Sequence, residues 1–177
     1  ITSTKLKVRD VNRGVDVKLA VAEGKNAALR DVDGNVYIDL ISGVATAPVG
    51  HCHPRVVNAV KKQVEKLINF AGQDFYNESQ MQLAKKLVEI TPGDSPKKVF
   101  LSNSGTESVE CALKLAKSYR KKPRMISFIG AFHGRTLGSL SLGGSKPVHF
   151  RDFAPLTPGV QVTHVPYGYC YRCPCRL

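Results

Sequence analysis

The chain has 177 residues, of which 42% are hydrophobic and 23% are charged, so it can bury an apolar core and is not disordered by composition. Its formal net charge is +12, but the basic residues lie on helix faces and in short turns, so we expect no nucleic-acid partner. No apolar run approaches about 18 residues and residues 1–14 lack an apolar leader, so we expect a cytoplasmic protein with no membrane partner.

The N-terminal part of the chain is predicted to form β-strands and then a helix. Residues 27–40 hold two apolar-patterned runs on either side of Asp33-Gly34, which predicts a β-hairpin. Residues 41–54 are broken by glycine and proline, which is typical of a loop. Pro54 then starts a predicted helix that extends to Phe70. Its apolar stripe consists of Val57, Val60, Val64 and Leu67, with lysines on the opposite face.

A second helix is predicted over Ser79–Ile90, and strands and helices alternate after it. Its predicted inward positions are Leu83, Ala84, Leu87 and Val88. The later elements are a strand over 97–102, a helix over Thr106–Arg120, and strands over 124–130 and 159–165. This alternation predicts an α/β fold with a mainly parallel sheet, in which ligands bind beyond the carboxyl ends of the strands.

The polar loop Ser102–Thr106 lies at one such strand end and at a helix start. A helix N-terminus carries unpaired N–H groups and partial positive charge, and Gly105 allows close approach of an anion. With the hydroxyls of Ser104 and Thr106, the loop could form a phosphate seat. The alternative is an ordinary helix cap, because Ser104 and Glu107 have the spacing of a capping box.

A second polar loop, residues 130–136, follows the next predicted strand and would lie beside the first if the two strands are neighbours. Phe132 can stack on a flat heterocycle, and Arg135 can bind a carboxylate with its planar guanidinium. The alternatives are a core position for Phe132, an internal hydrogen bond for His133 and a surface ion pair for Arg135. Together, the two loops predict a site for a phosphorylated aromatic cofactor and an amino acid.

The five cysteines are an odd number without a disulfide framework, which favours a reducing compartment. Cys170, Cys173 and Cys175 lie close together near the end of the chain. A structural zinc site needs at least one more ligand than these three thiolates. We therefore interpret the segment as an incomplete cysteine-rich loop and expect no metal.

Four stretches cover nearly the whole chain and read DVDGNVYIDLISGVA, GHCHPRVVNAV, FLSNSGTESVECALKLA and GAFHGRTLGSLSL. They resemble the class III aminotransferases, the pyridoxal-phosphate enzymes that include 4-aminobutyrate, ornithine and acetylornithine aminotransferases. The resemblance implies a type I pyridoxal-phosphate-dependent transferase fold, with a mainly parallel large-domain sheet and a smaller N-terminal α+β segment. It assigns residues 1–55 to the small domain and residues 56–177 to the first half of the large domain, and it implies a homodimer.

The resemblance also implies roles for the two polar loops. Ser104, Gly105 and Thr106 match the residues that hold the phosphate of pyridoxal 5'-phosphate. Phe132 matches the residue that stacks on the pyridine ring, and His133 lies beside it.

Substrate-binding roles follow in the same way. Arg135 matches the arginine that binds a substrate carboxylate, and Val44 matches a position that lines the substrate pocket. Tyr76 is expected to reach that pocket. Glu110 matches an acidic residue of the motif to which we assign no role from the sequence.

One departure concerns the catalytic residue itself. In the family, the Schiff-base lysine and the aspartate that pairs with the pyridine nitrogen lie well downstream of the Phe-His-Gly-Arg loop. No lysine here has a matching context, and the given sequence stops at Leu177. We therefore expect no catalytic residue in this chain, which we interpret as the N-terminal portion of a longer protein.

The expected reaction moves an amino group from a carboxylate-bearing amino acid, of the 4-aminobutyrate or ornithine type, to a 2-oxo acid. Two alternatives remain open. One is a racemase or decarboxylase of the same family, because the residues present do not decide which bond at the substrate carbon breaks. The other is a non-catalytic fragment that needs a second chain.

Overall fold

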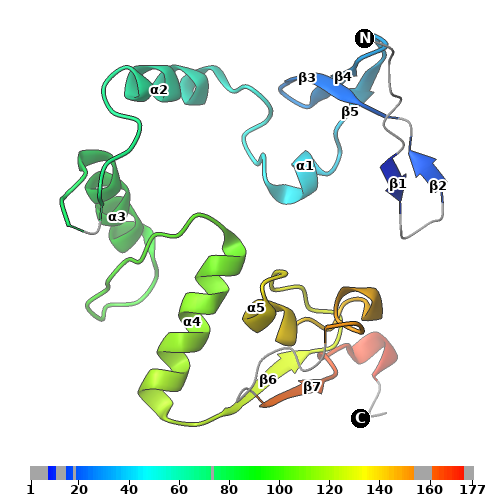
Figure 1. The fold of residues 1–177 in the computed structure, drawn as a ribbon, viewed down its shortest axis with the longest axis vertical. Coiled ribbons are helices and arrows are strands. Elements are labelled where there is room, and N and C mark those ends of the chain that lie inside the picture. Colours follow the sequence, from blue (N-terminus) through cyan, green and yellow to red (C-terminus); the bar gives the residue numbers. More distant parts are fainter. Residues whose placement is uncertain (1–7, 11–14, 18, 73, 154–160, 174–177) are drawn as a thin grey trace. The chain divides into compact units, whose positions relative to one another are not determined.

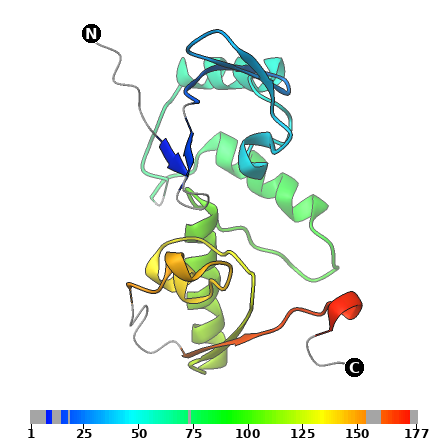
Figure 2. The same cartoon turned by 90° about the vertical axis from the view of Figure 1, so that its right-hand side faces the viewer.

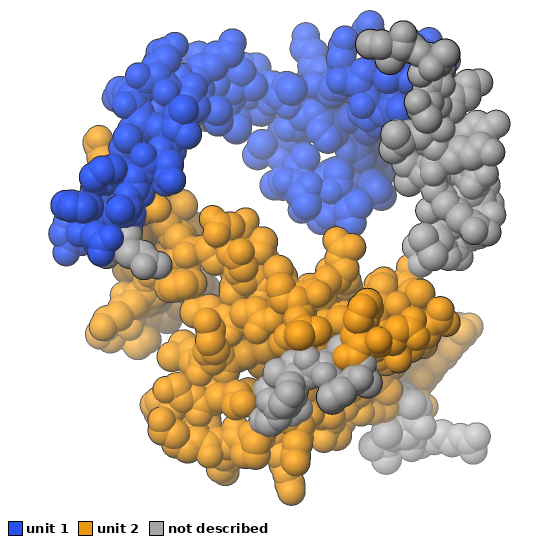
Figure 3. All heavy atoms as spheres, in the orientation of Figure 1, with its two compact units in different colours: residues 1–77 blue, residues 78–177 orange. Residues whose placement is uncertain are grey.

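The computed structural model describes residues 8–10, 15–17, 19–72, 74–153 and 161–173. The chain divides into two compact units, residues 1–77 and residues 78–177, which Figure 3 colours blue and orange. The assignment of residues 1–55 and 56–177 to a small and a large domain stays a prediction.

Unit 1 contains antiparallel strands followed by two helices. Its elements are β1 (Val8–Asp10), β2 (Val15–Val17), β3 (Val21–Lys25), β4 (Ala28–Asp31), β5 (Val36–Ile38), α1 (Ser42–Ala45) and α2 (Pro54–Val64) (Figure 1). β1 pairs with β2, and β3, β4 and β5 form a separate antiparallel sheet in that order.

The predicted β-hairpin is confirmed by the β4–β5 pair, and one carboxylate holds its turn. Asp31 is buried and accepts hydrogen bonds from the N–H groups of Asp33 (3.0 Å) and Asn35 (2.8 Å). It also accepts from the side chains of Asn35 and Tyr37, each at 3.0 Å. The hydrogen bond from the Asn35 side chain is the main cause that lowers the pKa of Asp31. Gly34 has a φ of 89° and so completes a turn that most residues could not form.

α1 is a single turn with an unusual backbone. Ser42, Gly43, Val44 and Ala45 have φ angles of 49°, 59°, 59° and 61°. Each non-glycine residue in the left-handed region costs about 1–2 kcal/mol, and a β-branched residue such as Val44 is an outlier there. The turn is therefore strained, and other interactions must hold it.

The two long amphipathic helices form near their predicted positions, but several residues of their apolar stripes are exposed. α2 ends at Val64 rather than Phe70, and α3 begins one residue before the predicted Ser79. Val60 and Val64 are 55% and 50% exposed, and Leu83 is 49% exposed. The prediction that Leu83 faces inward is therefore wrong within the described residues, whereas Ala84 and Leu87 of the same predicted face are half-buried.

Unit 2 follows the predicted alternation of helix and strand. Its elements are α3 (Glu78–Ile90), α4 (Gly105–Arg120), β6 (Arg124–Phe128), α5 (Leu137–Ser141), the 3₁₀ turns η1 (Pro147–His149) and η2 (Cys170–Arg172), and β7 (Gln161–Val165) (Figure 2). β6 and β7 pair in parallel, with Arg124 opposite Gln161, as the α/β prediction requires. Leu113 of α4 and Leu140 of α5 are the buried hydrophobic side chains among the described residues.

The predicted strand over residues 97–102 is wrong, since the structure assigns no strand there. A strand needs a neighbour for its backbone hydrogen bonds. No described segment pairs with residues 97–102, so their apolar pattern alone does not produce one.

Strain in α1 predicts that glycine is preferred over the alanine at position 45. Ala45→Gly should raise the stability of the complete protein by up to about 1 kcal/mol, because relief of the left-handed strain exceeds the entropic cost of glycine. Ala116→Gly, in the middle of α4, is the control and should lower stability by about 0.5–1 kcal/mol. Denaturant unfolding measures both, and equal losses would show that α1 is not strained.

Candidate functional site

The N-terminus of α4 is capped as the sequence predicts. Ser104 has extended backbone angles, and its Oγ accepts a hydrogen bond from the Glu107 N–H at 3.3 Å. The Glu107 carboxylate in turn accepts from the Asn103 N–H at 2.8 Å. The Ser104 half of the predicted capping box is therefore formed, whereas the Glu107 carboxylate binds the N–H of the residue before the cap.

The cap leaves two donors of the first helical turn free. Within the described residues, the N–H groups of Gly105 and Thr106 donate no hydrogen bond. A Cβ atom added at Gly105 would meet no atom within 4 Å. The cap and an anion would use different N–H groups, so the two interpretations of this loop are compatible.

A compact hydrogen-bond network joins the start of α4 to the start of α5. We call Thr106, Glu110, Thr136 and Ser139 the α4–α5 junction. Thr106 Oγ1 lies 2.6 Å from Ser139 Oγ and 3.0 Å from Thr136 Oγ1. Glu110 accepts from the Ser139 N–H at 3.0 Å and from the Thr136 hydroxyl. These contacts confirm that the two polar loops lie side by side.

Two glycines make the junction sterically possible. Gly134 has a φ of 126°, and a Cβ there would overlap Thr106 and lie 2.7 Å from Ser139 Oγ. A Cβ at Gly138 would lie 2.7 Å from Cδ of Glu110. Any larger residue at either position would push the two loops apart.

The loop of residues 130–136 presents the remaining predicted side chains. Phe132 is 57% exposed, which is at odds with a core position in the described chain, and its ring meets His149 edge to face at 5.9 Å. His133 is half-buried. Arg135 is exposed and has no carboxylate partner among the described residues, so the structure offers no support for a surface ion pair.

Val44 and Tyr76 belong to unit 1. They are 78% and 94% exposed. The structure does not place them relative to the loops of unit 2, so their part in a common site stays a prediction.

Sequence reasoning missed the role of the junction. Thr106 and Glu110 lie one turn apart on α4, a spacing that puts them on one helix face. This spacing was the feature of the sequence that could have indicated that the two side chains act together. It did not reveal that Thr136 and Ser139, about thirty residues later, supply the partners of both side chains.

The cysteine-rich segment gives no metal site among the described residues, where no group of His, Cys, Asp and Glu side chains could hold an ion. Cys170 is an exposed free thiol. Cys175 lies outside the described residues, so the incomplete-loop interpretation stays a prediction. Separately, none of the helices that the structure describes is long and apolar enough to cross a membrane.

The parallel pair β6–β7 makes this an α/β protein. The free N–H groups at the start of α4 are of the kind that suits an anionic ligand. The sequence profile of the family Aminotransferase class-III matches residues 11–175. The chain belongs to the class III aminotransferase family.

Individual relatives agree with this assignment. Acetylornithine aminotransferase of Methanopyrus kandleri is 49% identical over 150 residues, which cover 85% of this chain and 37% of the relative. Isoleucine 2-epimerase of Lentilactobacillus buchneri is 40% identical over 154 residues, which cover 87% of this chain and 34% of the relative.

A solved structure shows the same fold. Taurine:2-oxoglutarate aminotransferase from Bifidobacterium kashiwanohense, in complex with PLP and glutamate, matches with a TM-score of 0.76 at 27% identity. The match covers 86% of this chain and 34% of that one. The fold is thus that of the type I pyridoxal-phosphate enzymes, and the chain spans about a third of the length of the proteins it matches.

The junction predicts a large effect of Glu110→Ala. This change leaves the Ser139 N–H and the Thr136 hydroxyl without their charged acceptor, so it should lower the stability of the complete protein by about 1.5–3 kcal/mol. The control is Glu89→Ala, which removes an exposed ion pair with Lys86 and should cost about 0.5 kcal/mol or less. Denaturant unfolding compares them, and equal effects would contradict a structural role for Glu110.

Proposed function

We propose that the protein containing this chain is a pyridoxal 5'-phosphate-dependent aminotransferase. It moves an amino group from a carboxylate-bearing amino acid, of the 4-aminobutyrate or ornithine type, to a 2-oxo acid. Membership of the class III family supports the reaction class, and the family resemblance supports a homodimer. The donor type is inferred from Arg135 and from relatives such as the acetylornithine aminotransferase.

The observation that carries the proposal is the pair of free N–H groups at Gly105 and Thr106. They suit a phosphate group, since they add to the positive end of the α4 dipole and Gly105 leaves the approach open. Ser104 Oγ accepts from Glu107, so its own O–H can still donate to a phosphate oxygen. The Thr106 hydroxyl lies within the junction, so we expect Thr106 to act mainly through its N–H.

The second polar loop would hold the rest of the cofactor and the substrate. The exposed ring of Phe132 can stack on the pyridine ring, with His133 beside it. When bound, pyridoxal phosphate withdraws electrons from the substrate carbon that loses a proton. Arg135 would orient the substrate by a paired hydrogen bond to its carboxylate, and Val44 and Tyr76 would line the pocket.

A racemase or epimerase is the second candidate, because a relative of 40% identity is named isoleucine 2-epimerase. Both reactions use the cofactor-binding residues proposed above, so these residues do not separate them. The deciding experiment supplies the complete, cofactor-loaded protein with single amino acids, with and without 2-oxoglutarate. Glutamate formed in proportion to the donor consumed supports transamination. Chiral inversion without an acceptor supports racemisation, and no conversion supports a non-catalytic fragment.

The phosphate seat predicts that Gly105→Val weakens cofactor binding. A β-branched side chain at the first helical position would obstruct the phosphate, so the Kd for pyridoxal phosphate should rise about tenfold or more, or roughly 1.4 kcal/mol. Absorbance titration of the apo-protein measures the Kd. Melting of the apo-protein should change less than the increment that the cofactor adds. An unstable apo-protein with unchanged cofactor affinity would leave this loop as a helix cap alone.

The carboxylate clamp predicts a selective effect of Arg135→Lys. Loss of the paired hydrogen bond should raise KM for the amino donor by an amount equivalent to roughly 1.5–3 kcal/mol, with little change in cofactor binding. Steady-state kinetics at saturating acceptor measure it. Arg151→Lys, at an exposed arginine paired with its neighbour Asp152, is the control. Unchanged donor kinetics in a folded Arg135→Lys protein would show that Arg135 is not the clamp.

A further inference from the structure

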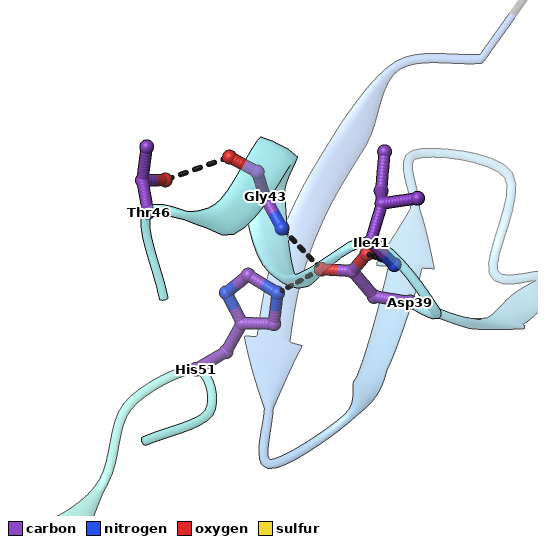
Figure 4. A network of polar contacts seen from close by, with 5 residues as sticks. All are labelled: Asp39, Ile41, Gly43, Thr46 and His51. Carbon is purple, nitrogen blue, oxygen red and sulfur yellow. Dashed lines mark hydrogen bonds and ion pairs between the residues drawn. The ribbon is translucent and has the colours of Figure 1, made fainter. Parts of the chain in front are cut away.

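The strained turn α1 is held by a single buried carboxylate (Figure 4). The Asp39 side chain is only 4% exposed. It accepts hydrogen bonds from the N–H groups of Ile41 at 3.1 Å and Gly43 at 2.8 Å. Thr46 adds a hydrogen bond from its hydroxyl to the Gly43 carbonyl at 2.7 Å. The Asp39 carboxylate thus fixes the backbone from Ile41, just before the turn, to Gly43 inside it.

His51 completes this set of donors from the far side of the turn. Its Nε2 lies 2.7 Å from Asp39 Oδ2. An ionised carboxylate can only accept, so the imidazole donates from Nε2. The hydrogen bond from His51 is the main cause that lowers the pKa of Asp39, with the N–H groups of Gly43 and Ile41 adding to it and burial opposing it. The Asp39 carboxylate is therefore charged and satisfied at neutral pH.

We call the hydrogen-bonded pair of Asp39 and His51 the Asp39–His51 clamp. Both residues are bound to the loop between β3 and β4. The backbone of His51 exchanges two hydrogen bonds with Asn26, at 2.9 and 2.8 Å, and the Asp39 N–H donates to the Ala27 carbonyl at 2.8 Å. A Cβ at Gly24 would lie 2.9 Å from His51 Cβ, so the imidazole packs tightly on β3. Asp39 and His51 therefore fix the turn α1 relative to the β3–β4 strands.

The strain in the turn is not offset by apolar burial. Val44 is 78% exposed even though its φ of 59° is unfavourable for a β-branched residue. Strained residues that surrounding interactions hold in place occur mainly at functional sites, where the strain fixes a geometry. The Asp39–His51 clamp thus maintains an exposed side chain in a conformation that the chain would not adopt by itself.

We propose that Asp39 and His51 are positioning residues that hold the turn Ser42–Ala45 rigid as a wall of the substrate pocket, and so set the affinity for the amino donor. This inference rests on the proposed function, through the pocket position assigned to Val44. Neither Asp39 nor His51 touches the substrate, and both act through the backbone of the turn. Their loss affects the donor and leaves the cofactor in place.

The test compares His51→Ala with His51→Gln in the complete protein loaded with pyridoxal phosphate. His51→Ala should raise KM for the amino donor about tenfold, with the Kd for the cofactor within about twofold of the parent. His51→Gln places an amide donor near the lost Nε2 and should bring KM back to within about threefold of the parent. Hydrogen exchange of the Gly43 amide should speed up in His51→Ala and recover in His51→Gln.

A matched pair of aspartate variants serves as an independent measurement. Asp39→Asn is close in shape but loses the charge that His51 and the turn bind, so it should behave like His51→Ala. Asp33→Asn makes the same change at an exposed carboxylate in the β4–β5 turn and should leave KM and Gly43 exchange unchanged. If His51→Ala does not fold, Asp39→Asn is judged by the same criteria.

Two results would overturn the inference. Faster exchange at Gly43 without a change in KM would make the turn a structural feature away from the pocket. Parallel losses of donor and cofactor affinity would indicate general loosening rather than positioning. Failure of the proposed function is seen separately, because the parent itself would then transfer no amino group. Calorimetric binding of the amino acid would in that case replace KM, with the same changes expected in Kd.

Discussion

The Glu110 carboxylate accepts a backbone N–H and a hydroxyl from the start of α5, so it holds the loop before α5 against the first turns of α4. The proposed site depends on this contact, since α4 carries the two free N–H groups and the loop carries Phe132 and Arg135. A carboxylate near a helix N-terminus is favourable in itself. Gly134 and Gly138 keep the space that the junction needs.

The first turn of α4 shows how one short sequence meets two demands. A helix start has more unpaired N–H groups than one capping side chain can satisfy. Here Ser104 satisfies the N–H of Glu107, and the N–H groups of Gly105 and Thr106 remain available to an anion. The hydroxyl of Thr106 is used in the junction, which couples the orientation of this turn to α5. Capping and ligand binding are therefore complementary uses of the same helix end.

Unit 1 relies on polar contacts for its local geometry. Asp31 orders the β4–β5 turn, and Asp39 orders α1, each by accepting several hydrogen bonds at once. Several residues of the α2 apolar stripe stay exposed within the described residues. Carboxylates that gather backbone N–H groups can fix short loops without a large apolar core, because each satisfied donor removes a desolvation cost.

Local pattern was sufficient for the hairpin about Asp33-Gly34, the helices α2, α3 and α4 and the cap at Ser104. Each of these depends on residues close together in the sequence. The strand predicted over residues 97–102 failed because a strand requires a distant partner. The left-handed backbone of Ser42–Ala45 was missed because the Asp39 carboxylate that holds it is itself bound by His51, which follows the turn. The role of Glu110 was likewise decided only by tertiary structure. Its partners, Thr136 and Ser139, come from a loop that the fold alone brings to α4.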